Sequence, residues 1–146
     1  MRFFVLVSHA DLAAGLKSAV EMVAGPRTDV LALGMQADGG GSRRFEEQLR
    51  ALLDRVAAAD ELVVFADLYG GSPLTTTLGV LSDRGLLSGA RVFAGANLPM
   101  VLTAVLSTEV MDAAALGEEI LAASQQGFVD VVIDAAQAPS SDDEEI

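Results

Sequence analysis

The chain has 146 residues, of which 51% are hydrophobic, and a formal net charge of −12 at pH 7. This length and apolar content suit a single domain with an ordinary core, and the absence of cysteine excludes disulfides, thiolate metal sites and thiol nucleophiles. The nine Lys and Arg residues are scattered, which argues against nucleic-acid binding because phosphate contacts need clustered basic side chains.

Short apolar, strand-like runs alternate with segments of helical period along the whole chain. The predicted strands cover residues 2–7, 29–33, 61–66, 91–94 and 128–133, and the predicted helices cover 11–24, 43–58, 73–84, 99–107 and 113–126. The helix over 43–58 has the clearest pattern, because after Ser42, its expected N-cap, one face carries Phe45, Leu49, Leu52, Leu53 and Val56. This alternation predicts an α/β domain with a mainly parallel sheet, since helices supply the crossovers that parallel strands need.

The ends of the chain and its glycine-rich loop carry less information. The first strand is too short to span a membrane and no signal-peptide pattern precedes it, so we expect a cytoplasmic protein. Residues 1–135 are expected to form one domain, and residues 136–146, with the acidic run SSDDEEI, a solvated and disordered tail. The loop ADGGGS at 37–42 has neither of the glycine spacings that cradle phosphate.

The chain has a single histidine, His9, which follows the first predicted strand directly. Taken alone, such a histidine is more often a packed or solvated side chain than a reactive one. Ligands of open, doubly wound α/β sheets, however, bind at the carboxyl ends of the strands, where the strand order switches direction. If the order is 2-1-3-4, the switch lies between the first and third strands, and the loop ADLYGGSP at 66–73 faces His9.

The residue types in this loop suit a reactive histidine. A carboxylate at Asp67 would fix the imidazole tautomer and leave the other ring nitrogen as a nucleophile. Gly70 and Gly71 allow a sharp turn, Ser72 is the expected N-cap, and Pro73 suits the first helical position. Free N–H groups at that helix start predict an anion site. The alternative is that GGSP only initiates a helix and that Asp67 is a local cap.

No metal site and no cofactor are predicted from these residues. Neither lysine, arginine nor a cluster of metal ligands joins the loop. Nucleotide hydrolysis with a bound cation is therefore poorly supported.

Three stretches of the chain resemble the IIA component of the mannose-type (fructose/mannose/sorbose) sugar phosphotransferase system. They are VLVSHADLAAGLKSAVEMVAG around His9, ADLYGGSP around Asp67, and AGANLPM at 94–100, and the resemblance spans about residues 2–130. It implies a phosphotransferase in which His9 accepts a phosphoryl group from the histidine-containing phosphocarrier protein. The group then passes to a IIB component, here expected to be a separate chain, and membrane IIC and IID components take part indirectly.

The same resemblance implies roles for further residues. Asp67 would orient the His9 ring, and the amides of Gly71 and Ser72, with the Ser72 side chain, would hold the phosphoryl oxygens next to Gly70. The supporting positions are Tyr69, Pro73, Asn97, Pro99 and Met22, and for Met22 core packing is the alternative. Thr75 stands where the family usually has asparagine, which puts any contact of that asparagine in doubt.

The resemblance also implies a homodimer, with residues 128–133 as an edge strand that is exchanged with the partner's sheet. Two other functions stay open. One is the phosphocarrier subunit of a dihydroxyacetone kinase, a related fold with an early histidine whose second loop would be expected to lack Gly-Gly-Ser-Pro. The other is a regulatory module of the same fold that senses phosphorylation. The sugar is not encoded in this chain, because specificity belongs to the membrane components.

Overall fold

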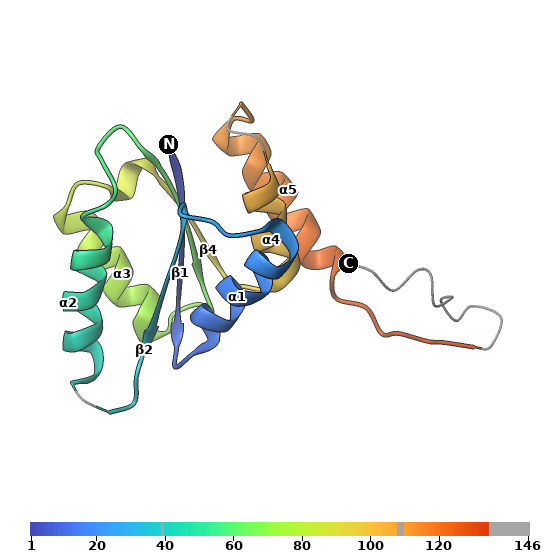
Figure 1. Ribbon diagram of the computed structural model, residues 1–146, viewed down its shortest axis with the longest axis horizontal. Coiled ribbons are helices and arrows are strands. Elements are labelled where there is room, and N and C mark those ends of the chain that lie inside the picture. The colour runs from blue at the N-terminus through green and yellow to red at the C-terminus, as the bar shows by residue number, and fades with distance from the viewer. Residues whose placement is uncertain (39, 108–109, 135–146) are drawn as a thin grey trace.

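The computed structural model describes residues 1–38, 40–107 and 110–134 and shows a four-stranded parallel sheet between two layers of helices (Figure 1). The strands are β1 (Arg2–His9), β2 (Val30–Met35), β3 (Glu61–Ala66) and β4 (Ala90–Ala94). Their order is β2-β1-β3-β4 and all neighbouring pairs are parallel. The predicted open α/β sheet with the order 2-1-3-4 is therefore confirmed.

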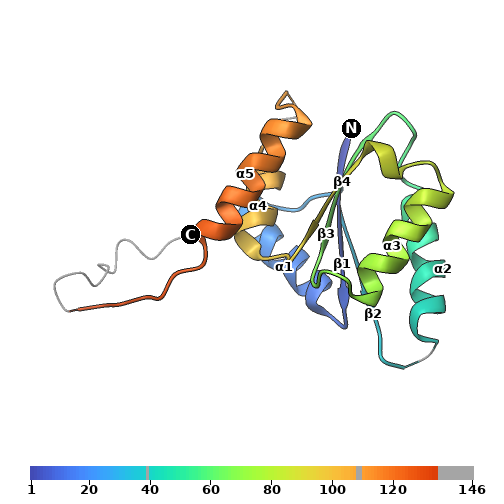
Figure 2. The same cartoon turned by 180° about the vertical axis from the view of Figure 1, so that it is seen from behind.

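The helices cover both faces of this sheet. They are α1 (Leu12–Ala24), α2 (Gly41–Leu53), α3 (Ser72–Asp83), α4 (Leu98–Leu106) and α5 (Ala113–Gln126), with a short 3-10 turn, η1 (Leu87–Gly89), ahead of β4. Helices α2 and α3 lie on one face, and α1, α4 and α5 lie on the other, as the views from front and back show (Figures 1 and 2). No helix in the described parts of the chain is both long and apolar enough to cross a bilayer.

The core has two halves because successive residues of a strand point to opposite faces of the sheet. On β1, Phe3 and Val5 are buried in the cluster that includes the apolar side of α2. Phe4 and Leu6 are buried in the other cluster, together with residues of α1, α4 and α5. A strand that is buried on both sides explains the unbroken apolar run of the sequence.

Helix α2 differs from its prediction at both ends. It begins at Gly41 with Gly40 as its N-cap, so the prediction of Ser42 as the cap is wrong. It ends at Leu53 and not at residue 58, because the chain leaves the helix through tighter turns in which the N–H of Val56 donates to the carbonyl of Leu53. Val56 still packs against the core from this turn. The apolar period therefore outlasts the helix.

A fifth strand is absent from the described sheet. Residues 128–133 adopt no strand pairing and run away from the body of the fold (Figures 1 and 2). The prediction of a strand here is wrong for the single chain, because strand-forming residues need a neighbouring strand to bond with. The predicted acidic tail at 136–146, like the last residue of the predicted 1–135 domain, lies outside the described residues.

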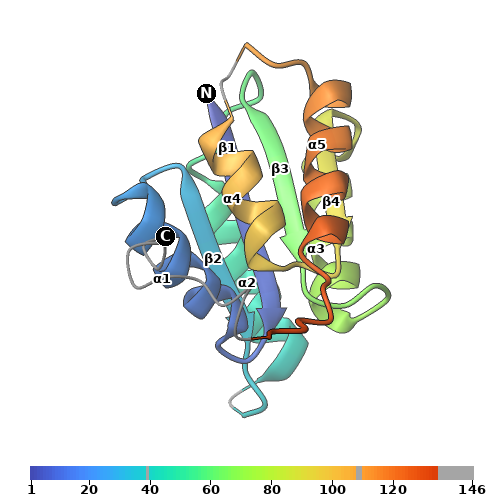
Figure 3. The same ribbon diagram turned by 90° about the vertical axis from the view of Figure 1, so that its right-hand side faces the viewer.

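The site is positioned by the two central strands. In Figure 3 the arrows of β1 and β3 both point toward the lower edge of the sheet, and β1 reaches further down. The strands pair in register up to Val7 and Ala66. The residues that follow these two positions, at the end of β1 and after β3, are therefore brought to the same edge.

Candidate functional site

His9 and Asp67 meet at the carboxyl edge of the sheet. His9 is the last residue of β1, and its Nδ1 lies 2.8 Å from Oδ2 of Asp67, the residue after β3. The same carboxylate oxygen accepts the backbone N–H of His9 at 2.8 Å, and Oδ1 accepts the N–H of Leu68 at 2.8 Å. The side chain of His9 is 48% exposed, whereas that of Asp67 is only 9% exposed. The carboxylate is thus a fixed support under a ring that remains open to solvent.

The protonation state of Asp67 sets the tautomer of His9. Burial raises the pKa of the Asp67 carboxyl, but the hydrogen bonds from the backbone and ring of His9 and from Leu68 outweigh it, so its pKa lies below the usual value. An ionised carboxylate can only accept hydrogen bonds, so Nδ1 of a neutral His9 carries the proton. Nε2 then holds a lone pair and is free to act as a nucleophile.

The lowered pKa predicts how stability depends on pH. The Asp67 carboxylate stabilises the fold above its usual pKa of 3.8, and that contribution is lost as the pH falls through the lower pKa of the folded state. Urea unfolding should show Asp67→Asn less stable than wild type at neutral pH, with the gap closing in acid. Glu119→Gln, at an exposed position of α5, is the matched control for removal of one carboxylate charge. A gap that stays constant with pH would contradict the role given to this carboxylate.

The loop after Asp67 packs its backbone against the imidazole. Gly70 has a φ of +78°, which favours glycine, and a Cβ at Gly71 would lie 3.1 Å from Cε1 of His9. Gly71 is the N-cap of α3, so the prediction of Ser72 as the cap is wrong. The helix begins one residue earlier than predicted, with Ser72 as its first residue and Pro73 as its second. The start of α3 therefore lies beside the ring that carries Nε2.

The hydrogen bonds of the loop change the expected role of one amide. The N–H of Gly71 donates to the carbonyl of Leu68 at 3.2 Å, so it already has an acceptor within the turn. The carbonyl of Gly71 accepts both the N–H of Thr75 at 3.0 Å and its Oγ1 at 3.1 Å. Thr75 thus fastens the end of the loop to the first turn of α3. Within the described parts of the chain, neither the N–H nor the hydroxyl of Ser72 makes a hydrogen bond.

Large apolar and aromatic side chains close to His9 and Asp67 in the sequence are exposed. Tyr69 is 92% exposed, and Leu68 beside it and Leu12 at the start of α1 are also exposed. Leu12, Leu68 and Tyr69 all lie within three residues of His9 or Asp67 in the chain, and all three are exposed.

The loop after β4 is tied to the end of β3 and to the helices behind this edge of the sheet. The N–H of Ala96 donates to the carbonyl of Ala66 at 2.9 Å, which ties the loop to the end of β3. Asn97 caps α4 by accepting the N–H of Met100, and its Nδ2 donates to Ser124 of α5 at 2.8 Å. Pro99 packs close to Gly127 at the end of α5. Asn97 and Pro99 thus join α4 and α5 behind this edge of the sheet.

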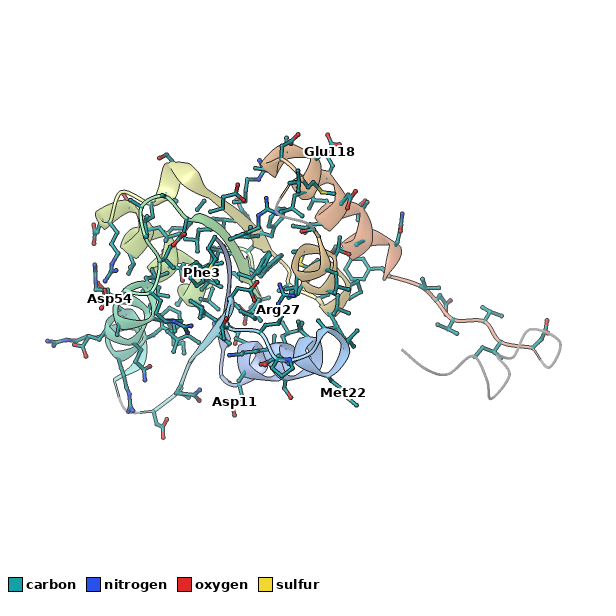
Figure 4. The ribbon with its side chains drawn as sticks, turned by 45° about the horizontal axis from the view of Figure 1, so that its top comes forward. Phe3, Asp11, Met22, Arg27, Asp54 and Glu118 are labelled. Carbon is teal, nitrogen blue, oxygen red and sulfur yellow. The ribbon has the colours of Figure 1, made fainter. Side chains whose placement is uncertain are left out.

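Met22, one of the predicted supporting positions, lies on α1 away from the start of that helix. It lies about three helical turns along α1 from Asp11 (Figure 4). Its side chain is 91% exposed, so the alternative of core packing is wrong.

Ser8, which precedes His9, was missed by sequence reasoning. Its side chain is buried, and its Oγ accepts the N–H of Ala13 at 2.8 Å, so it caps the start of α1 across the turn. Asp11, the residue before the helix, makes no such side-chain cap. The available signal was a serine between the first predicted strand and the first predicted helix. An N-cap side chain normally accepts an N–H two or three residues further along the chain, however, whereas Ala13 is five residues from Ser8.

The described residues contain no group of three His, Cys, Asp or Glu side chains arranged to hold a metal ion. The candidate site is therefore built from one imidazole, one carboxylate and the start of a helix. Such a set can hold and transfer an anionic group by nucleophilic attack from nitrogen.

Comparison with known proteins identifies relatives of this arrangement. The family model EIIA-man, described as PTS system fructose IIA component, matches residues 3–121. The mannose/sorbose-specific IIA subunit from Enterococcus faecalis is 25% identical with a TM-score of 0.77, over 91% of this chain and 96% of that one. No curated protein sequence matches the chain.

Two further solved structures are similar. A PTS IIA protein associated with the fucose utilization operon of Streptococcus pneumoniae is 26% identical with a TM-score of 0.75, over 88% of this chain and 92% of that one. Component EIIA from Streptococcus agalactiae is 26% identical with a TM-score of 0.73, over 89% and 97%. Since the family model spans most of the chain and these solved IIA components share its fold, the chain belongs to the EIIA-man family of sugar phosphotransferase-system IIA components.

Proposed function

We propose that this chain is a cytoplasmic phosphoryl carrier that accepts a phosphoryl group on Nε2 of His9 and hands it on during sugar uptake. The donor is the histidine-containing phosphocarrier protein and the acceptor is a separate IIB component. The observation that carries this proposal is the bond between Nδ1 of the half-exposed His9 and the buried Asp67. This bond leaves Nε2 as the ring nitrogen with a lone pair.

The transfer needs no cofactor and no proton relay. The lone pair of Nε2 forms the new N–P bond while the N–P bond of the donor breaks, and the departing donor nitrogen keeps that electron pair. Nδ1 retains its proton throughout, bound to Asp67. In the onward step the N–P bond of His9 breaks and Nε2 keeps the electron pair, while the acceptor group of the IIB component forms the new bond to phosphorus. Catalysis then consists of positioning and charge compensation in a loose, in-line transfer.

The start of α3 supplies the phosphoryl cradle in this proposal. Ser72 offers its N–H and hydroxyl at the helix N-terminus, where directed hydrogen bonds and the helix dipole favour an anion. Gly70 provides the turn, and Gly71 leaves room beside Cε1 of His9. Because the amide of Gly71 is already bonded to Leu68, we assign the donor role to Ser72.

Two proteins must dock in turn over His9. Leu12, Leu68 and Tyr69 are exposed and lie close in the chain to His9 or Asp67, so they offer contact area to a partner. The net charge of −12 favours a partner with a basic face.

The decisive experiment is phosphotransfer from phosphoenolpyruvate through the general phosphocarrier proteins, followed by mapping of the labelled residue. We expect one acid-labile, base-stable phosphoryl group on His9. Label on another residue, or none, would contradict the proposal. Label that passes on to a dihydroxyacetone kinase instead of a IIB component would favour that alternative; against it stands the Gly-Gly-Ser-Pro loop packed beside the ring.

The cradle is tested by two variants of the loop. Gly71→Val should block transfer, because even a Cβ there would lie 3.1 Å from the ring of His9. Ser72→Ala should slow transfer with little loss of melting temperature, because the hydroxyl of Ser72 makes no cap hydrogen bond in the structure. Initial transfer rates and melting temperatures are measured on the same preparations. Normal rates in both folded variants would show that the loop only starts the helix.

We further propose that the chain forms a homodimer in which residues 128–133 pair with the partner's sheet. Phe128, Val131, Val132 and Ile133 are exposed in the single chain, and no strand among the described residues pairs with this segment. Edge pairing between protomers would cover these side chains.

Sedimentation should therefore show a dimer that dissociates when Val131 and Ile133, on one side of an extended segment, are both replaced by Asp. Val110→Asp, the same change at an exposed position outside the segment, should leave the dimer intact. A monomeric wild type, or a dimer that tolerates the double variant, would contradict the proposal.

A further inference from the structure

The turn that follows His9 has an unfavourable backbone conformation. Ala10 has a φ of +47°, and among the described residues every other positive φ belongs to a glycine. Residues with a Cβ avoid this left-handed region, and such outliers persist only where the surroundings hold them in place. The side chain of Ala10 is exposed, so its own packing does not explain the conformation.

Contacts between the backbone of this turn and β2 hold Ala10. Its N–H donates to the carbonyl of Met35 at 2.8 Å. Its carbonyl oxygen lies only 1.7 Å from the place where a Cβ on Gly34 would stand, and its carbonyl carbon 2.9 Å from it. Gly34 has no positive φ in the structure, so the need for glycine here comes from this close approach alone.

A third contact joins the turn to α1. The hydroxyl of Ser8 donates to the carbonyl of Ala10 at 3.4 Å while it accepts the N–H of Ala13 at 2.8 Å. On the opposite side, Asp67 accepts both the backbone N–H and the ring Nδ1 of His9. His9 is therefore held by β3 through its carboxylate partner and by β2 through the next residue of its own chain.

We propose that Gly34 is a positioning residue for His9. By having no side chain, it lets the carbonyl of Ala10 lie against β2, which keeps the turn left-handed and the imidazole on Asp67. This inference rests on the proposed phosphoryl-carrier function. Displacing a reacting group by about an ångström can cost on the order of a hundredfold in rate, and a side chain at position 34 demands a backbone shift of that size.

The test compares Gly34→Ala with Gly79→Ala. Gly79 lies inside α3, has no positive φ, and a Cβ there would meet nothing within 4 Å. Gly34→Ala should lower the maximal single-turnover rate of phosphorylation about a hundredfold. The phosphocarrier concentration that gives half of this rate should stay the same, because the exposed side chains of Leu12, Leu68 and Tyr69 are unchanged. Gly79→Ala should match wild type in both quantities.

A spectroscopic readout separates positioning from general loss of structure. The NMR signals of the His9 ring and of its backbone N–H report the two bonds to Asp67 directly. Both should shift in Gly34→Ala, whereas the signals of the β3 and β4 core should not. A folded Gly34→Ala with wild-type His9 signals, or with a wild-type transfer rate, would overturn the inference.

A second variant covers the case in which Gly34→Ala does not fold. Ala10→Val destabilises the same turn, because a β-branched residue disfavours the positive φ of position 10. The side chain of this position is exposed, and the variant leaves β2 unchanged. It should reproduce the loss of rate and the shifted His9 signals, and wild-type behaviour would overturn the inference. If wild type itself accepts no phosphoryl group, the proposed function fails, while the NMR comparison still decides whether Gly34 positions His9.

Discussion

His9→Ala should abolish phosphorylation while leaving the fold intact. The variant removes the nitrogen that forms the N–P bond, and the chain has no second histidine to replace it. The side chain lies half exposed at the end of β1, outside both core clusters, so little packing is lost. The backbone N–H of residue 9 can still donate to Asp67, which preserves one of the two bonds between them. Radiolabel incorporation and melting temperature are the measurements.

The control for this experiment is His9→Asn, which keeps a polar side chain but supplies no nucleophilic ring nitrogen. It should also remain unlabelled, with a melting temperature close to that of wild type. Label on either variant at the wild-type level would show that another residue accepts the phosphoryl group. An unfolded His9→Ala beside a folded, unlabelled His9→Asn would still support the assignment.

Asp67→Ala should slow transfer by roughly tenfold to a hundredfold without abolishing it. This range corresponds to the loss of one charge-assisted hydrogen bond, about 1.5–3 kcal/mol, fully felt in the transition state. The carboxylate orients the ring and holds the proton on Nδ1 but does not take the phosphoryl group. The variant should also melt at a lower temperature, because the N–H groups of His9 and Leu68 lose their acceptor.

Single-turnover rates for Asp67→Ala and Asp67→Asn separate the two effects. Asn keeps an oxygen that can accept from a backbone N–H but has no charge, so it should recover stability more than rate. A wild-type rate in both variants would show that Asp67 only caps the turn. A rate of zero in a folded Asp67→Asn would show that the carboxylate does more than orient the ring.

The pairing of His9 with Asp67 was predictable because it follows from topology. Apolar runs and helical periods indicate parallel strands joined by helices, and a switch between the first and third strands brings their carboxyl ends together. The register of β1 and β3 then places the residue after β3 beside the last residue of β1. Local turn chemistry was predictable only to within a residue, as the shift of the α3 cap from Ser72 to Gly71 shows.

The sequence by itself therefore determined the α/β class and, with the strand order 2-1-3-4 as the working prediction, the edge at which His9 and Asp67 meet. The tertiary structure alone decided how the turn after His9 is held, because the contact of Gly34 with Ala10 joins backbones 24 positions apart. No periodicity or local propensity records such a contact. The tertiary structure also decided the environment of Met22: its apolar side chain predicted packing, but its place on α1 leaves it exposed. The tertiary structure likewise decided that residues 128–133 form no strand in the single chain, because residues with strand propensity form a strand only where a neighbouring strand is there to bond with.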